Sequence, residues 1–156
     1  MDEVEAHLGY AFHDRALLEA ALTHPSYGGD HRVPHYQRLE FLGDSVLGMV
    51  TATRLYQLYP DMPEGKMSRL RAELVCEQAL HGVALTLHLG DYIRLGHGEE
   101  RSGGRERPSI LADAVEAVIA ASWLSAITWR LSEHMRSERM GLRLYGMAEE
   151  PIWFFS

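Results

Sequence analysis

Two pairs of acidic residues stand inside apolar helical patterns, which is an unusual place for charge. Glu40 and Asp44 lie one turn apart within "YQRLEFLGDSVL", and Asp113 and Glu116 are three residues apart within "LADAVEAVIAA". Residues spaced by three or four positions share one face of a helix. Carboxylate oxygens without cysteine are the ligands that Mg²⁺ or Mn²⁺ prefers. Divalent ions held by carboxylates can activate water and stabilise a leaving oxygen, which is the chemistry of phosphodiester hydrolysis.

The cost of bringing four carboxylates together indicates a cation. If the two helices pack face to face, each like-charged pair about 4 Å apart costs on the order of 4 kcal/mol at an effective dielectric constant near 20. A domain's whole free energy of unfolding is roughly 5–15 kcal/mol, so protons or cations must neutralise the cluster. The alternative is that each pair is a solvated helix edge, and the spacing alone does not exclude it. The pairing of the two helices is an assumption at this point.

The elements that must position these acids read as helices, so we expect an all-α fold. Apolar residues recur with helical period along most of the chain, and strand-like alternation is scarce. Pro25, the pair Gly28–Gly29, Pro60, Pro63 and Gly90 should interrupt the helices. The expected helices cover residues 15–24, capped by Asp14, about 36–59, about 64–89 with a bend near Glu77, and 109–121, continuing to about 139. Residues 96–109 should form a polar, glycine-rich loop.

The helix over residues 36–59 has two distinct faces. At about 100° per residue, its predicted core stripe contains Leu39, Leu42, Val46, Met49 and Val50, with Thr53 as its polar member. The row of Glu40 and Asp44 borders this stripe. Phe41 points away from it, among the small residues Ser45, Gly48 and Ala52. An exposed aromatic ring on such a surface suggests a protein partner, although the chain itself could cover the ring.

Composition bounds the class of protein. The chain has 156 residues, 46% of them hydrophobic and 24% charged, which suits one globular domain. We expect no apolar run long enough to span a membrane, and no secretory signal at the acidic N-terminus. Cys76 is the only cysteine, which fits a reducing cytoplasm. A net charge of −7 argues against a purely electrostatic nucleic-acid binder but not against an enzyme that holds nucleic acid through metal ions.

Four segments carry a resemblance to a known family. They are "ALTHPSY", "RLEFLGDSVL", "EGKMSRLRAELV" and "ERSGGRERPSILADAVEAVIAA". In sequence, order and separation they resemble the nuclease domain of bacterial ribonuclease III, from about residue 8 to residue 121. The resemblance implies an all-helical, homodimeric endoribonuclease that cleaves double-stranded RNA. It also implies 5′-phosphate and 3′-hydroxyl ends with short 3′ overhangs, and the processing of ribosomal, messenger and other RNA precursors.

The resemblance assigns roles to residues. Glu40, Asp113 and Glu116 would ligate Mg²⁺, for which Mn²⁺ could substitute. Asp44 and Glu116 would be catalytic, with Asp44 positioning the attacking water. Phe41 would enter a pocket of the other subunit. Further candidates, for contacts with RNA, are Gln37, His24, Ser26 and Ser102.

The sequence also departs from the family pattern. Residue 37 is Gln where the family commonly has Glu, so an acidic role there is in doubt. After residue 121 the likeness ends, and the double-stranded-RNA-binding domain that usually follows is not found. We therefore expect a nuclease domain over 1–121 and a divergent segment over 122–156. That segment either completes the helical domain or results from a frameshift, because another reading frame over residues 126–131 can encode Asp-Tyr-Leu-Glu-Ala.

Two other functions compete with the nuclease. A non-catalytic protein that binds double-stranded RNA, or a scaffold, could retain the fold, but loss of one or more acids would then be expected, and all four are present. An oxygen-activating carboxylate bundle would need Glu-x-x-His pairs on its helices, and the acids here have no such partner.

Overall fold

The computed structural model describes residues 2–139, and within that range the chain is helical, as predicted. Its helices are α1 (Asp2–Leu8), α2 (Arg15–Ala21), α3 (Pro25–His31), α4 (Gln37–Leu58), α5 (Glu64–Leu74), α6 (Glu77–Thr86), α7 (His97–Arg101) and α8 (Pro108–Arg139), with 3₁₀ turns η1 (Leu89–Asp91) and η2 (Gly104–Glu106). An isolated parallel bridge joins Thr23 to Arg94. Pro25 begins a helix instead of only interrupting the chain, because proline is favoured in the first helical turn.

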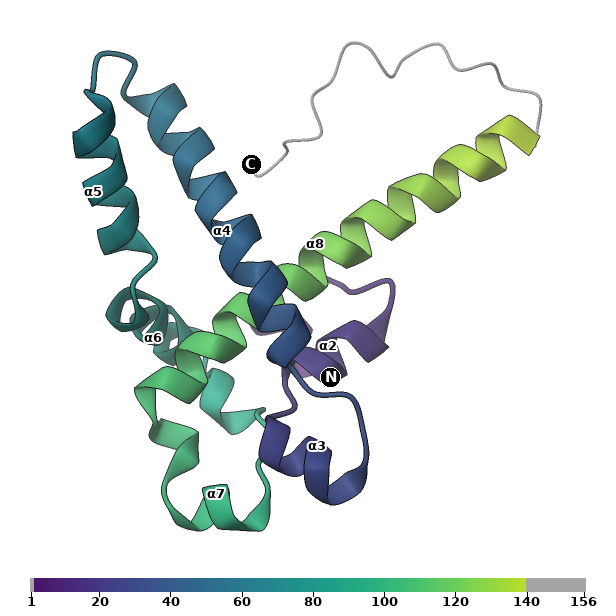
Figure 1. The fold of residues 1–156 in the computed structure, drawn as a ribbon. Coiled ribbons are helices and arrows are strands. Elements are labelled where there is room, and N and C mark those ends of the chain that lie inside the picture. Colours follow the sequence, from purple (N-terminus) through teal and green to yellow (C-terminus); the bar gives the residue numbers. More distant parts are fainter. Residues whose placement is uncertain (1, 140–156) are drawn as a thin grey trace.

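Helix α8 is the centre of the fold, and α4 crosses it (Figure 1). The first half of α8 is rich in alanine, and helices α2, α4 and α6 pack around it. Its buried residues include Ala114, Ala117, Ala120 and Ala121. Such small side chains let neighbouring helices approach closely, so the half of α8 that carries Asp113 and Glu116 is held from several sides.

The predicted core stripe of α4 is only partly correct. Leu39 and Val46 are buried, but the Met49 side chain is 39% exposed. Beyond the crossing, α4 leaves α8 and pairs mainly with α5, so the two helices form a hairpin that projects from the body (Figure 1). Met49 therefore lies where no third helix within residues 2–139 covers the stripe.

Two further expectations need correction. The helix predicted over 64–89 is two helices, since α5 ends at Leu74 and Cys76 has an extended backbone before α6. The break lets α6 pack on α8, whereas α5 stays with α4. The predicted loop over 96–109 contains α7 and η2. Ion pairs of Arg105 with Glu100 and of Arg107 with Glu99 stabilise these turns without an apolar face.

The second half of α8 packs on the N-terminal part of the chain. The buried hydroxyl of Ser125 accepts a hydrogen bond from the amide of His13 at 3.0 Å. The His13 ring stacks on Trp129 with a centroid separation of 4.0 Å. Residues 122–130, which follow the predicted family likeness, thus pack against the helical body. Residues 140–156 of the predicted divergent segment lie outside the described residues.

The expectation that no apolar run is long enough to span a membrane is wrong when helices are judged by length and composition alone. One segment within the described residues, Pro108–Arg130 in α8, satisfies both criteria. More than half of it is buried inside the protein, as befits the central helix of the fold. A buried core helix passes the same test, so the segment is weak evidence for a membrane.

Candidate metal centre

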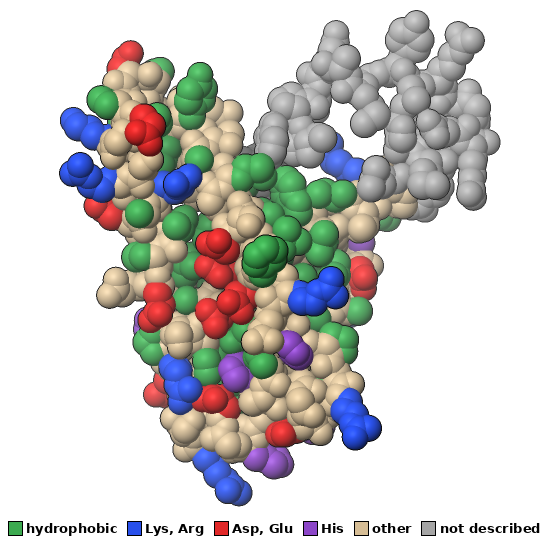
Figure 2. Space-filling view, viewed as in Figure 1, with side chains coloured by type: hydrophobic (Ala, Val, Ile, Leu, Met, Phe, Trp, Pro, Cys, Tyr) green, Lys and Arg blue, Asp and Glu red, His purple; other side chains and the backbone are tan. Residues whose placement is uncertain are grey.

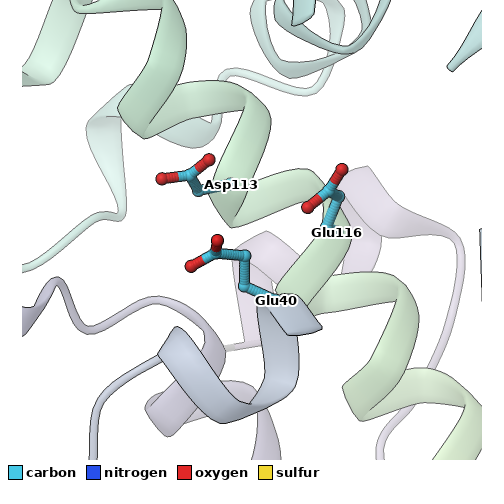
Figure 3. Close-up of side chains that lie close together, drawn as sticks. All are labelled: Glu40, Asp113 and Glu116. Carbon is cyan, nitrogen blue, oxygen red and sulfur yellow. The ribbon is translucent and has the colours of Figure 1, made fainter. Parts of the chain in front are cut away.

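Three of the four predicted acids meet where α4 crosses α8. Glu40 comes from the first turn of α4, and Asp113 and Glu116 come from α8. Their carboxylates point toward one another (Figure 3), and one oxygen from each lies within 4.8 Å of the others. In space-filling view, acidic side chains gather over this crossing in the middle of one face (Figure 2). The assumed pairing of the two helices is therefore correct.

Burial and mutual repulsion raise the pKa of these carboxyl groups, so the groups ionise less readily. Burial, and then the charges of Asp44, Asp113 and Glu40, raise the pKa of Glu116 to about 7. Burial, and then the charge of Asp113, raise the pKa of Glu40. A bound cation would favour the charged forms of these carboxylates and offset the repulsion between them.

Asp113 has the most varied surroundings of the three. Its pKa is raised, and burial is the main cause. A hydrogen bond from the Tyr36 hydroxyl to Oδ2, at 3.4 Å, acts in the opposite direction by favouring the charged form. The charge of Glu77, at the start of α6, raises the pKa further, and His24 lowers it. The charge of Glu77 on helix α6 thus adds to the negative electrostatic potential at the site.

Asp44 lies beside the three-carboxylate group but outside it. It stands one turn after Glu40 on α4, and its side chain is exposed. Its charge is the largest electrostatic contribution to the raised pKa of Glu116. It is therefore close enough to act on the site without being one of the three converging ligands.

The predicted RNA-contact residues occupy different environments. His24 caps α3, where its Nδ1 accepts a hydrogen bond from the amide of Ser26 at 3.1 Å. The Ser26 hydroxyl accepts from the amide of Gly96 at 2.9 Å. Gln37 is exposed at the start of α4, and Ser102 is exposed after α7, where its hydroxyl accepts from Arg107 at 3.0 Å. His24 and Ser26 thus have polar atoms engaged inside the protein.

Phe41 lies next to the site on the outer side of α4. Its side chain is 78% exposed, so within the described residues the chain does not cover the ring. The structure excludes the alternative that residues 2–139 bury it.

Two residues that shape the site were not predicted from the sequence. Tyr36 stands four residues before Glu40, on the same helical row, so its spacing was an available signal. Gly43 stands between the two acids of α4 and is buried against α8. A glycine inside a strongly patterned helix usually has a packing reason, and this was the second signal.

The fold and the site define an all-helical domain with a cluster of three converging carboxylates, and comparison with known proteins identifies its family. The family model "Ribonuclease-III-like" matches residues 14–141. Ribonuclease 3 of Aromatoleum aromaticum is 56% identical over 124 residues, which are 80% of this chain and 53% of that protein. Ribonuclease 3 of Moorella thermoacetica is also 56% identical over 124 residues, or 76% of this chain and 53% of that protein. The chain belongs to the ribonuclease III family, and it spans about half the length of the curated relatives that it matches.

A solved structure shows the same fold. The nuclease domain of ribonuclease III from Campylobacter jejuni is 38% identical and superposes with a TM-score of 0.76. The match covers 90% of this chain and 98% of that chain. That structure is described as showing flexibility in a region involved in dimer formation. The predicted family and the predicted fold are both confirmed.

Proposed function

We propose that this chain is the nuclease part of an endoribonuclease that hydrolyses double-stranded RNA. The single observation that carries the proposal is the convergence of Glu40, Asp113 and Glu116 at the crossing of α4 and α8. Membership of the ribonuclease III family supports it. The proposed products have 5′-phosphate and 3′-hydroxyl ends with short 3′ overhangs, and the proposed substrates include ribosomal and other RNA precursors in the cytoplasm.

The three converging carboxylates would hold the metal ion. Their hard oxygen donors fit Mg²⁺, with Mn²⁺ as a substitute. Burial raises the pKa of all three carboxyl groups, so a cation that offsets their charges would be favoured. Bound there, Mg²⁺ would supply Lewis-acid activation of water and of the scissile phosphate. The carboxylates of Glu40 and Asp113 would place the ion, and Glu116 would act both as ligand and in catalysis.

The exposed Asp44 would orient the attacking water. Its carboxylate can accept a hydrogen bond from a water molecule at the open side of the cluster. The water oxygen attacks phosphorus in line and gives up a proton to solvent, the bond to the ribose 3′ oxygen breaks, and that oxygen takes up a proton from solvent to become the 3′-hydroxyl. This displacement requires no protein nucleophile.

A dimer would place two such sites on one duplex, with each site cutting one strand. The exposed Phe41 ring supports a partner surface on α4. If two copies of α4 pair antiparallel about Gly48, Phe41 faces a residue near position 55 of the other copy. A recess of about 440 Å³ lies there between α4 and α5, lined by Ala52, Thr53, Leu55, Tyr56, Glu64, Met67, Ser68 and Arg71. We propose that this recess receives the ring.

Contacts with RNA are proposed for Gln37, His24, Ser26 and Ser102. The net charge of −7 gives the chain no overall attraction for RNA phosphates. Affinity should therefore be weak and should fall as salt rises. Equal cleavage rates at low and at physiological ionic strength would contradict this part of the proposal.

The extent of the domain is part of the proposal. We propose that residues 1–121 carry the catalytic machinery and that residues 122–156 form a divergent extension. Its beginning belongs to the folded body, as the contacts of Ser125 and Trp129 support, and the family match extends into it as far as residue 141.

The test is cleavage of a long, labelled RNA duplex in Mg²⁺, with an EDTA control. Wild-type protein should produce staggered duplex fragments only with the metal. The Glu116→Gln variant should lose this activity, whereas Glu3→Gln, an equivalent change at an exposed site on α1, should retain it. A folded, dimeric wild type that binds the duplex without cutting it would favour the non-catalytic RNA-binding function.

A further inference from the structure

Tyr36, the residue that immediately precedes α4, is buried next to the proposed metal centre. Its side chain is only 2% exposed, and its hydroxyl lies 3.4 Å from Oδ2 of Asp113. Within the described residues, this is the one side-chain hydrogen bond found on the three converging carboxylates. Asp113 is therefore the ligand candidate whose orientation another side chain can control.

Hydrogen bonds fix the backbone of Tyr36 at its amide and at its carbonyl. Its amide donates a hydrogen bond to the carbonyl of Thr23 at 2.9 Å, and its carbonyl accepts one from the amide of Glu40 at 2.8 Å. Its ring meets His24 edge to face, with centroids 5.5 Å apart and planes at 79°. Because the same residue is bonded to the backbone of Glu40 and to the side chain of Asp113, it links ligand candidates from two helices.

His24 in turn is held by its own neighbours. Its Nδ1 lies 2.7 Å from the hydroxyl of Ser26, and that hydroxyl is bonded to the amide of Gly96. The ring that packs on Tyr36 is thus anchored to the segment before α7. These contacts leave the tyrosine hydroxyl little freedom to move away from Asp113.

We propose that Tyr36 is a positioning residue for the metal centre. By donating to Oδ2, its hydroxyl orients the Asp113 carboxylate so that the other oxygen faces Glu40 and Glu116. A carboxylate held in this way loses less conformational freedom when it binds a cation, and partners of metal ligands commonly contribute 10- to 100-fold to metal affinity. This proposal rests on the proposed function, because it requires that the three carboxylates hold a divalent cation.

A purely structural role for Tyr36 makes a different prediction. If the ring only fills the core and the hydroxyl only finds a partner there, removing the hydroxyl should change stability and leave metal affinity unchanged. Tyr36→Phe keeps the ring and removes the donor. Tyr10→Phe is the matched control, because the Tyr10 hydroxyl is also part-buried and donates to a carbonyl, that of Ser122, at 3.5 Å, away from the site.

The experiment is a Mn²⁺ titration of the metal-free full chain, followed by the electron paramagnetic resonance signal of free Mn²⁺. Tyr36→Phe should weaken the affinity by about 10-fold or more. Tyr10→Phe should remain within about twofold of wild type. In duplex cleavage, Tyr36→Phe should raise the half-saturating Mg²⁺ concentration by a similar factor, and the rate at saturating Mg²⁺ should change little.

The outcomes separate this inference from the proposed function. Wild-type binding of Mn²⁺ that is lost in Glu40→Gln but unchanged in Tyr36→Phe would overturn the role of Tyr36 alone. Absence of binding in the wild type, or equal binding in Glu40→Gln, would overturn the metal centre and this inference together. If Tyr36→Phe fails to fold, replacement of Tyr36 by 4-aminophenylalanine, which retains a donor, should keep wild-type affinity, and a 10-fold loss there would contradict the proposal.

Discussion

Gly43 of α4 packs directly on the backbone of Glu116 in α8. A methyl group added at Gly43 would overlap the carbonyl group of Glu116 and lie 3.0 Å from its Cα. Any side chain at this position would therefore force the two helices apart. Since Glu40 lies one turn before Gly43, the same close approach brings its carboxylate to those of α8.

The first prediction concerns this glycine. Gly43→Ala should lower the free energy of unfolding by about 1–3 kcal/mol, because overpacking a close helix contact outweighs the better helix propensity of alanine. It should also weaken Mn²⁺ binding, because the carboxylates move apart. Chemical denaturation and metal titration would measure the two effects.

Gly82 provides the matched control for Gly43. It lies within α6, and a methyl group added there would meet nothing within 4 Å. Gly82→Ala should gain up to about 1 kcal/mol from helix propensity and keep wild-type metal affinity. Equal stability changes for the two alanine variants would show that the crossing of α4 and α8 is not as close as described.

Part of this site was predictable from the sequence. The spacing of Glu40 with Asp44 and of Asp113 with Glu116 defines two helix faces, and the cost of grouped charges indicates a cation. The spacing did not show which of the four acids would lie outside the group of converging carboxylates. Asp44 lies outside the group of three converging carboxylates, although its charge still acts on Glu116 of α8.

The fold was predictable where helical patterns are long, and less so elsewhere. The turns α7 and η2 were expected as loop because their support is charge pairing, such as Arg105 with Glu100, and not an apolar face. The division of the predicted helix over 64–89 depends on α6 packing against α8. Tertiary contacts determine that packing. Val75 and Cys76 are not helix-breaking residues, so the break could not be predicted from them.

The second prediction is the pH dependence of stability in the metal-free protein. The pKa of Glu116 is about 7 in the folded chain against an ordinary value of 4.5, so between these values the folded state binds more protons than the unfolded state. The free energy of unfolding should then decrease as pH rises from about 4.5 to 7 and change little above that range. The raised pKa values of Glu40 and Asp113 act in the same direction.

Thermal unfolding of wild type and Glu116→Gln across this pH range would measure the effect. The variant should show a smaller loss of melting temperature, since it carries no charge at this position. Glu3→Gln should follow the wild type. A constant difference in melting temperature between wild type and Glu116→Gln at all pH values would contradict the raised pKa.

The third prediction concerns addition and removal of metal. A ligand that binds only the folded state adds about 2.7 kcal/mol when its concentration is 100 times the dissociation constant. Mg²⁺ or Mn²⁺ should therefore raise the melting temperature, and EDTA should reverse the rise. The stabilisation should be larger at pH 8 than at pH 6, because protons compete for Glu116 at the lower pH. A rise of the same size in Glu116→Gln would place the bound metal elsewhere.

The fourth prediction concerns the exposed ring on α4. Phe41→Ala should weaken self-association by 10-fold or more, because a large aromatic side chain in a partner's pocket is the kind of contact that dominates an interface. Sedimentation equilibrium would measure the change. The thermal stability of the isolated subunit should change little, because the ring is 78% exposed there.

Two further variants complete the test of Phe41. Leu85→Ala, at an exposed apolar position on α6, should leave self-association unchanged. Met67→Glu would place a charge in the recess between α4 and α5, so it should weaken association as Phe41→Ala does. If Met67→Glu dimerises like the wild type while Phe41→Ala does not, the ring contacts another part of the partner. If neither variant weakens association, the exposed face of α4 is not the dimer surface.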